Sequence, residues 1–143
     1  MVYYNKGSHT VHKIEYHLVW VTKYRYEILN KNMKLRLIEL IKQGCDARNI
    51  KIIKGHVGSD HIHILVSCPP TIAVSEIVKY LKGRSSKFMQ EEFSELKTRY
   101  WGRHLWATGY FCATVGAVTE EMIKEYIENQ DKEDMKDIFT IED

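Results

Sequence analysis

Two apolar, β-branched segments joined by a short turn constrain the fold of this chain more than any other feature of its sequence. Residues 50–57 and 61–68 are predicted strands, and the Gly-Ser-Asp sequence at 58–60 is typical of a turn. Pro69 and Pro70, the only two prolines, end the second strand because proline cannot donate a hydrogen bond to a sheet. The two strands are close enough in sequence to pair as a hairpin.

The rest of the chain alternates between the periods of strands and helices. Strands are predicted at 12–24 and 105–115, and helices at 32–47, 73–91 and 119–136. With the hairpin in its place, the first six elements have the split βαβ, or ferredoxin-like, order. We therefore expect an α+β fold in which helices pack on one antiparallel sheet. An additional C-terminal helix follows Thr119, a predicted N-cap.

The 143 residues have the length of one domain, and we expect one domain over 1–143. Within it, 1–10 form an N-terminal extension and 137–143 an acidic tail.

The net charge of +2 hides an uneven distribution of charges. Residues 1–118 carry 18 Lys and Arg against 9 Asp and Glu, a net of +9, whereas 119–143 carry 3 against 10, a net of −7. The basic part of the chain favours a nucleic acid as partner.

Several classes of protein lose their usual signatures here. No apolar run approaches the roughly 18 residues of a membrane span, and the N-terminus lacks an apolar signal-peptide core. Cys45, Cys68 and Cys112 are odd in number and scattered, which favours reduced thiols in a cytoplasmic protein. GxGxxG, GxxxxGK[ST] and HExxH motifs are absent. We therefore expect no membrane anchor and no nucleotide cofactor.

His61 and His63 are the first candidates for chemistry. Side chains alternate along a strand, so both imidazoles leave the same face while Ile62 enters the other. Two imidazoles on one strand can chelate a divalent metal, although two partly exposed strand histidines are an equally good interpretation of this pattern alone. The other histidines, His17 and His56 among them, are assigned to the surface or the core.

Tyr126 and Gln130 are the second pair of candidates. They are i and i+4 on the predicted helix 119–136, so their side chains share one face, about 5–6 Å apart. A glutamine amide oxygen can be a third neutral metal ligand, held within one turn of a phenol. A tyrosine at the edge of the core beside a solvated glutamine explains the same spacing.

Five segments together resemble the single-tyrosine HUH transposases, where HUH denotes two histidines around a bulky apolar residue. These are small transposases of insertion sequences that move as single-stranded DNA, with their REP-associated relatives. The resembling segments are 17–25, 58–66, 80–87, 105–111 and 126–130, within a match over roughly residues 10–131. One departure is Gly58-Ser59, where many members have Met-Pro before the aspartate.

The resemblance implies a site and a reaction. His61, His63 and Gln130 would bind Mg²⁺ or Mn²⁺, and Tyr126 would attack a DNA phosphate to leave a 5′-phosphotyrosine and a free 3′-OH, without ATP. The implied partners are single-stranded DNA with a hairpin at transposon ends and a second copy of the chain. In such a homodimer the tyrosine helix can complete the site of the other subunit. The implied setting is a prokaryotic cytoplasm, with chromosomal or plasmid DNA as target.

Basic and aromatic side chains are the candidate DNA contacts, because cations neutralise phosphates and rings stack on unpaired bases. Taken singly, each is also explained by a solvated face or a core aromatic. The candidates are Lys23, Arg25, Lys79, Lys82, Arg84, Lys87, Arg99, Arg103, Trp101 and Trp106.

Other functions compete with transposition. A non-catalytic ferredoxin-like nucleic-acid-binding module would have no use for Tyr126. A relaxase or replication-initiator nuclease would share the HUH chemistry, but such proteins are usually larger. A two-histidine phosphodiesterase would need a second histidine motif, which the sequence lacks.

Overall fold

A five-stranded sheet forms the centre of the structure, which is a computed structural model describing residues 5–6, 11–100, 104–114 and 139–141. The strand order is β6-β3-β5-β4-β7. The strands are β3 (Glu15–Val21), β4 (Lys51–Val57), β5 (His61–Ser67), β6 (Phe111–Thr114) and β7 (Phe139–Ile141). Neighbouring strands are antiparallel, except that β7 runs parallel to β4.

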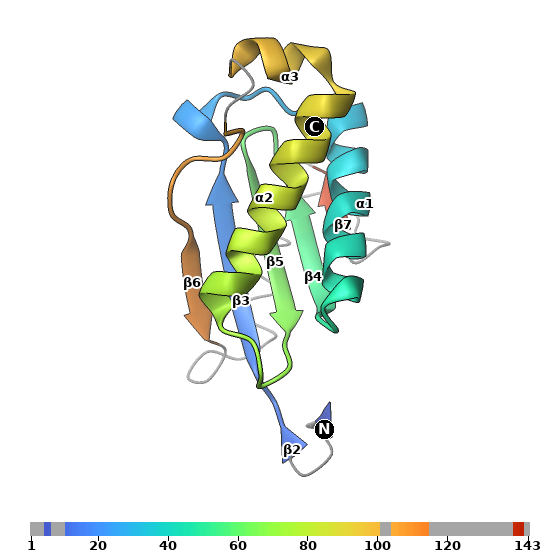
Figure 1. The fold of residues 1–143 in the computed structure, drawn as a ribbon, viewed down its shortest axis with the longest axis vertical. Helices are drawn as coiled ribbons and strands as arrows, with labels where there is room; N and C mark the ends of the chain where they lie inside the picture. The colour runs from blue at the N-terminus through green and yellow to red at the C-terminus, as the bar shows by residue number, and fades with distance from the viewer. Residues whose placement is uncertain (1–4, 7–10, 101–103, 115–138, 142–143) are drawn as a thin grey trace.

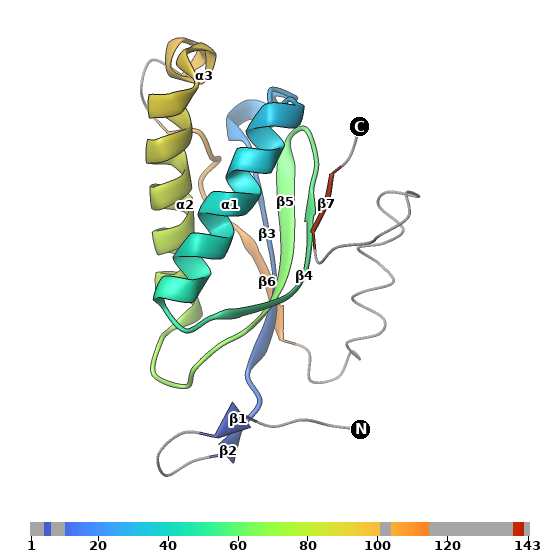
Figure 2. The same cartoon turned by 90° about the vertical axis from the view of Figure 1, so that its right-hand side faces the viewer.

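The two long helices cover one face of this sheet. Figure 2 shows α1 (Lys31–Ala47) and α2 (Val74–Glu92) on the same side, and the short α3 (Ser94–Arg99) follows α2. A single 3-10 turn, Lys23–Arg25, follows β3. The small strands β1 (Asn5–Lys6) and β2 (Val11–His12) pair with each other, apart from the main sheet. Among the described helices, none is long and apolar enough to cross a membrane.

The predicted α+β, ferredoxin-like fold is confirmed. The elements β3, α1, β4, β5, α2 and β6 follow the split βαβ order along the chain (Figure 1). Their four strands form an antiparallel sheet with helices packed on it. The additional C-terminal helix predicted at 119–136 lies outside the described residues.

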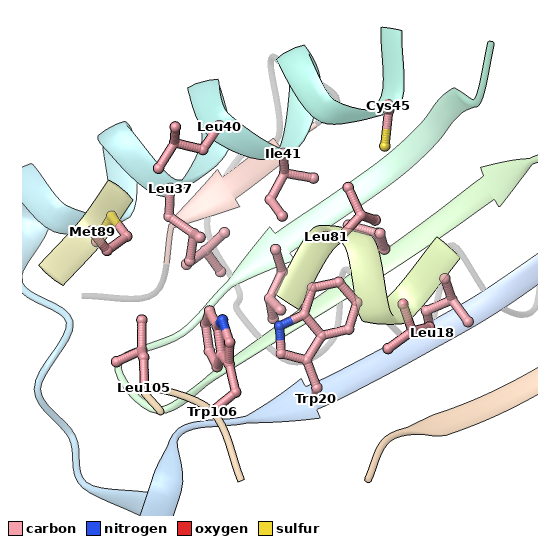
Figure 3. Close-up of a cluster of buried hydrophobic side chains, with 14 of the residues drawn as sticks. Leu18, Trp20, Leu37, Leu40, Ile41, Cys45, Leu81, Met89, Leu105 and Trp106 are labelled. Carbon is pink, nitrogen blue, oxygen red and sulfur yellow. The ribbon is translucent and has the colours of Figure 1, made fainter. Parts of the chain in front are cut away.

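Alternation along β3 and β5 decides which side chains face the helices. Leu18 pairs with Ile64 and Trp20 with Ile62, and all four are buried. Figure 3 shows the helix side chains of this core, which are Leu37, Leu40, Ile41 and Cys45 from α1 and Leu81 and Met89 from α2. The alternate residues of β3 and β5 therefore point to the opposite face of the sheet.

Two predicted strands are too long. The strand predicted at 12–24 spans only Glu15–Val21, because His12 belongs to the separate strand β2 and the backbone turns into the left-handed region at Tyr24 and Arg25. The strand predicted at 105–115 is limited to Phe111–Thr114. Leu105 and Trp106 before it are buried, and Trp106 forms an isolated bridge with Thr22.

The predicted acidic tail, 137–143, contains a strand. β7 pairs with the edge of β4, and the buried ring of Phe139 lies over Gly55. A Cβ atom on Gly55 would overlap that ring. The absence of a side chain at Gly55 therefore makes room for Phe139 in the core.

Candidate metal centre and DNA-binding surface

His61 and His63 lie together on the sheet face opposite α1 and α2. They alternate with the buried Ile62 on β5, and their ring centroids are 4.7 Å apart. The backbone spacing of a strand therefore presents two imidazoles side by side, which is the arrangement that can share one metal ion.

Asp60 fixes the orientation of His61. The Nδ1 atom of His61 is 2.6 Å from Oδ1 of Asp60, and Arg25 donates from Nε and Nη2 to Oδ2 of the same carboxylate, both at 3.0 Å. Burial would raise the pKa of Asp60, but the hydrogen bonds from His61 and Arg25 outweigh it and lower the pKa below its usual value. An ionised Asp60 accepts the Nδ1 proton of His61 and leaves Nε2 as the nitrogen that can bind a metal.

The Nε2 atom of His61 fits that role. It is buried and has no hydrogen-bond partner among the described residues. A carboxylate on one imidazole nitrogen and a metal on the other is a recurring arrangement in metal sites. The residues present therefore fit a divalent cation at this position.

His63 is held in its neutral form. Burial, and then the neighbouring imidazoles of His61, His17 and His56, lower the pKa of His63 to about 3. A metal ligand must be a neutral imidazole, so this environment favours coordination over protonation at neutral pH.

His17 and His56 lie around His63, an arrangement that was not predicted from the sequence. The His17 ring on β3 is 5.8 Å from that of His63, and the His56 ring on β4 is 5.9 Å from it. The pairing of β3 and β4 with β5 brings these rings together.

The described residues contain no group of three or more His, Cys, Asp or Glu side chains arranged to hold a metal. Tyr126 and Gln130 lie outside the described residues.

One predicted DNA contact, Arg25, touches this centre through its pairing with Asp60. Two others lie over tyrosine rings, with Lys23 Nζ 5.4 Å from the Tyr24 ring centroid and Arg99 4.3 Å from that of Tyr26. Trp101 and Arg103 lie outside the described residues.

Other predicted contacts come from α2. Lys82 donates to the carbonyl oxygens of Ala107 and Gly109, at 2.8 and 2.9 Å, and burial lowers its pKa. A cavity of about 410 Å³ beside it is lined by Lys79 and His104 among others. The Arg84 and Lys87 cations lie over the Phe88 ring, at 5.0 and 5.6 Å.

Trp106 belongs to the core. Only 4% of it is exposed, its ring meets Trp20 edge-on at 6.1 Å, and its indole N–H donates to the Ser85 hydroxyl at 2.9 Å. The ring cannot stack on a base without leaving that position, so the structure corrects the prediction that Trp106 is a base-stacking residue.

Comparisons with known proteins match nearly the whole chain. The model of the family "Transposase IS200 like" matches residues 10–130. The chain is 35% identical over 127 residues to the transposase for insertion sequence element IS200 of Salmonella typhimurium, covering 89% of this chain and 83% of that protein. It is 36% identical over 129 residues to the ISDra2 transposase TnpA of Deinococcus radiodurans, covering 90% and 92%.

Solved structures share the fold. A crystal structure of a protein assigned as a transposase from Deinococcus radiodurans R1 has a TM-score of 0.74 and 35% identity, covering 88% of this chain and 97% of that one. A REP-associated tyrosine transposase bound to a REP hairpin has a TM-score of 0.58 and 13% identity, covering 90% and 67%. The second likeness is one of fold.

Proposed function

The chain belongs to the IS200-like transposase family and is a DNA transposase with endonuclease activity, and on this premise we propose that it cuts and rejoins single-stranded DNA by a metal-dependent tyrosine mechanism. The observation that carries the proposal is the Asp60–His61 pair beside a neutral His63. It combines an oriented imidazole, a buried Nε2 atom and a second ligand on the same strand.

The proposed metal ligands are His61, His63 and Gln130, and the proposed ion is Mg²⁺ or Mn²⁺. All three ligands are neutral, so the ion would keep its full charge to polarise a phosphoryl oxygen. Asp60 and Arg25 orient His61 but are not themselves ligands, so their charges do not enter the proposed set of three ligands. Gln130 enters the proposal through its spacing from Tyr126 and through family membership.

Tyr126 is the proposed nucleophile. Its phenolic oxygen would attack the phosphorus atom and lose its proton, while the bond from phosphorus to the 3′ oxygen breaks and that oxygen gains a proton. A 5′-phosphotyrosine and a free 3′-OH result. The covalent link conserves the energy of the phosphodiester, so another 3′-OH can displace Tyr126 and join new ends without ATP.

The proposed substrate is single-stranded DNA carrying a hairpin at each transposon end. The net charge of +9 over residues 1–118 supports a polyanionic substrate. A relative of the same fold is bound to a REP hairpin, which supports a DNA hairpin as ligand.

We further propose a homodimer in which the Tyr126 helix of one subunit completes the site formed by the histidines of the other. Mixing His61→Ala with Tyr126→Phe subunits restores cleavage only with such sharing.

Covalent trapping tests the mechanism. Wild-type protein is incubated with Mg²⁺ and single-stranded or duplex transposon-end DNA, and the adduct is resolved on a denaturing gel. We expect an adduct on single strands only, lost in Tyr126→Phe, in His61→Ala and in chelator, and retained in the control Tyr110→Phe. An undiminished adduct in Tyr126→Phe would exclude this nucleophile. No adduct from the wild type on any DNA would favour a non-catalytic binding module.

A further inference from the structure

The loop after β3 is held in a strained conformation. Tyr24 and Arg25 are consecutive and have φ angles of 63° and 55°, in the left-handed region that residues with a Cβ atom avoid. Hydrogen bonds hold this backbone on both sides. Thr22 donates from N to the carbonyl of Asp60 at 2.8 Å and from Oγ1 to that of Tyr26 at 2.8 Å, and Arg25 N donates to the carbonyl of Thr22 at 2.9 Å. Such strain persists where the surrounding structure enforces it, and it is typical of functional sites.

The strained loop displays an exposed ring. Tyr24 is 69% exposed, more than any other large apolar or aromatic side chain of the described residues. Its ring lies 5.4 Å from that of Tyr26, which lies 6.0 Å from the buried ring of Tyr100. We call Tyr24, Tyr26 and Tyr100 the tyrosine platform. Because the outermost ring buries so little surface, its contribution to folding does not explain the strain.

Cations flank the platform. Lys23 Nζ lies 5.4 Å from the centroid of the Tyr24 ring, and the Arg99 guanidinium lies 4.3 Å from that of Tyr26. Exposed aromatic faces beside basic groups have the chemistry that binds unpaired nucleotides, in which bases stack on rings and cations hold phosphates.

The platform adjoins the candidate metal centre. Arg25, next to Tyr24 in the chain, pairs with Asp60, and Asp60 binds His61. Figure 1 shows the loop after β3, the turn between β4 and β5, and α3 at one end of the sheet. A strand whose phosphate lies at His61 and His63 therefore has the platform within reach of its neighbouring nucleotides.

We propose that the tyrosine platform binds an unpaired base of the single-stranded DNA substrate, next to the phosphate that is cut. The base stacks on Tyr24, and Lys23 and Arg99 face the adjoining phosphates. This proposal rests on the proposed function, since it requires a single-stranded substrate at the metal centre. It makes Tyr24 a positioning residue that orients the strand and takes no part in the bond changes.

Binding to an oligothymidylate of about 20 nucleotides tests the platform, since stacking tolerates any base. Full-length wild type, Tyr24→Ala and Tyr24→Phe are compared by fluorescence anisotropy in chelator, which prevents cutting. Leu35→Ala is the control, because Leu35 is also exposed, at 45%, and lies on α1, outside the platform. We expect Tyr24→Ala to weaken binding about 5- to 100-fold, the usual effect of losing one base stack, with Tyr24→Phe and Leu35→Ala close to wild type.

Two further measurements distinguish stacking from charge and from misfolding. A base-free oligomer of abasic deoxyribose phosphates should bind wild type and Tyr24→Ala equally, because it has nothing to stack. The dependence of binding on salt should be unchanged in Tyr24→Ala and weaker by about one ion in Lys23→Ala. Tyr24→Gly relieves the strain at positive φ, so its unfolding midpoint should rise while its DNA affinity falls.

The proposal would be overturned if Tyr24→Ala bound the oligothymidylate as tightly as the wild type does. An equal loss on the abasic oligomer would also overturn it, as would a change in oligomeric state on sedimentation, which would make the platform a protein contact. The covalent adduct of the wild-type protein separates this proposal from the proposed function. If the wild type forms the adduct but Tyr24→Ala does not change binding, only the proposal about the platform is wrong. If the wild type forms no adduct on any DNA, the proposed mechanism itself is wrong.

Discussion

The hydrogen bond between Asp60 and His61 is the contact on which the candidate metal centre depends most directly. It combines a short distance of 2.6 Å with an ionised carboxylate, and Arg25 holds the other side of that carboxylate. The bond keeps the proton of His61 on Nδ1 and so leaves Nε2 available to a metal. Weakening it should therefore affect metal binding before it affects folding.

Asp60→Asn keeps the shape of the side chain and removes its charge. We expect the Mn²⁺ concentration that gives half-maximal adduct to rise about 10- to 100-fold, the usual cost of losing a residue that orients a metal ligand. Excess Mn²⁺ should restore the yield, and the unfolding midpoint should change little. Asp46→Asn, at an exposed position on α1, is the matched control. Unchanged metal dependence in Asp60→Asn would show that Asp60 does not tune this site.

At the same scale, the sequence predicted the placement of His61 and His63 because strand alternation is a local property. It did not predict His17 and His56 around them. These residues reach His63 from two different strands, and the pairing register of those strands is set by the core packing of residues such as Leu18 and Ile64. Local periodicity carries no information about that register.

At the scale of elements, the predicted order of the first six strands and helices was right and two strand lengths were wrong. Leu105 and Trp106 continue an apolar pattern because they are buried, and not because they pair along a strand. Leu105 N donates to the Ser86 hydroxyl and the Trp106 indole N–H to that of Ser85, so α2 holds these two residues in addition to the isolated bridge between Trp106 and Thr22. The sequence pattern reports burial, and burial does not require a sheet. β7 was missed because three residues in an acidic segment give too short a pattern.

The contact between β4 and β7 yields a prediction for Gly55. In Gly55→Ala the new Cβ meets the Phe139 ring, which must leave the core or push the two strands apart. We expect a loss of about 1–3 kcal/mol in the free energy of unfolding, measured in urea. Gly83→Ala is the control, because no atom lies within 4 Å of its added Cβ and alanine favours the helix by about 0.5–1 kcal/mol.

A double-mutant cycle assigns the cost of Gly55→Ala to its cause. In a Phe139→Ala background the ring is absent, so the added Cβ of Gly55→Ala should cost much less than in the wild type. An equal cost in both backgrounds would place the strain elsewhere in β4.

At the scale of the whole molecule, the distribution of charges indicates a polyanionic partner, whereas the small net charge does not. Several cations of the basic part of the chain occupy two described surfaces. Lys23 and Arg99 lie at the tyrosine platform and Arg25 pairs with Asp60 of the candidate metal centre, whereas Lys79 and Lys82 lie along α2. A strand of DNA could contact the first surface at the proposed site of cutting and the second with a segment farther from it. The total of +2 conceals both, because the acidic residues are concentrated after residue 118.

The buried histidines on the sheet face opposite the helices also make the stability of the whole molecule depend on pH. Burial lowers the pKa of His17, and burial with the neighbouring imidazoles lowers that of His63 from 6.5 to about 3. Between about pH 6.5 and pH 3 the unfolded chain therefore holds protons that the folded chain does not. The free energy of unfolding should fall on acidification, by up to about 1.4 kcal/mol per pH unit for each such histidine.

Thermal unfolding in chelator between about pH 7 and pH 4.5 checks this dependence without interference from metal binding, which itself competes with protons. The midpoint of the wild type should fall with pH, and His63→Gln should fall less steeply because one histidine is removed from the balance. The control for the loss of a histidine is His104→Gln, because His104 is exposed and lies outside this group of imidazoles. Equal slopes in wild type and His63→Gln would mean that His63 takes up its proton in the folded chain as readily as in the unfolded one, and that the imidazole is not held neutral for a metal.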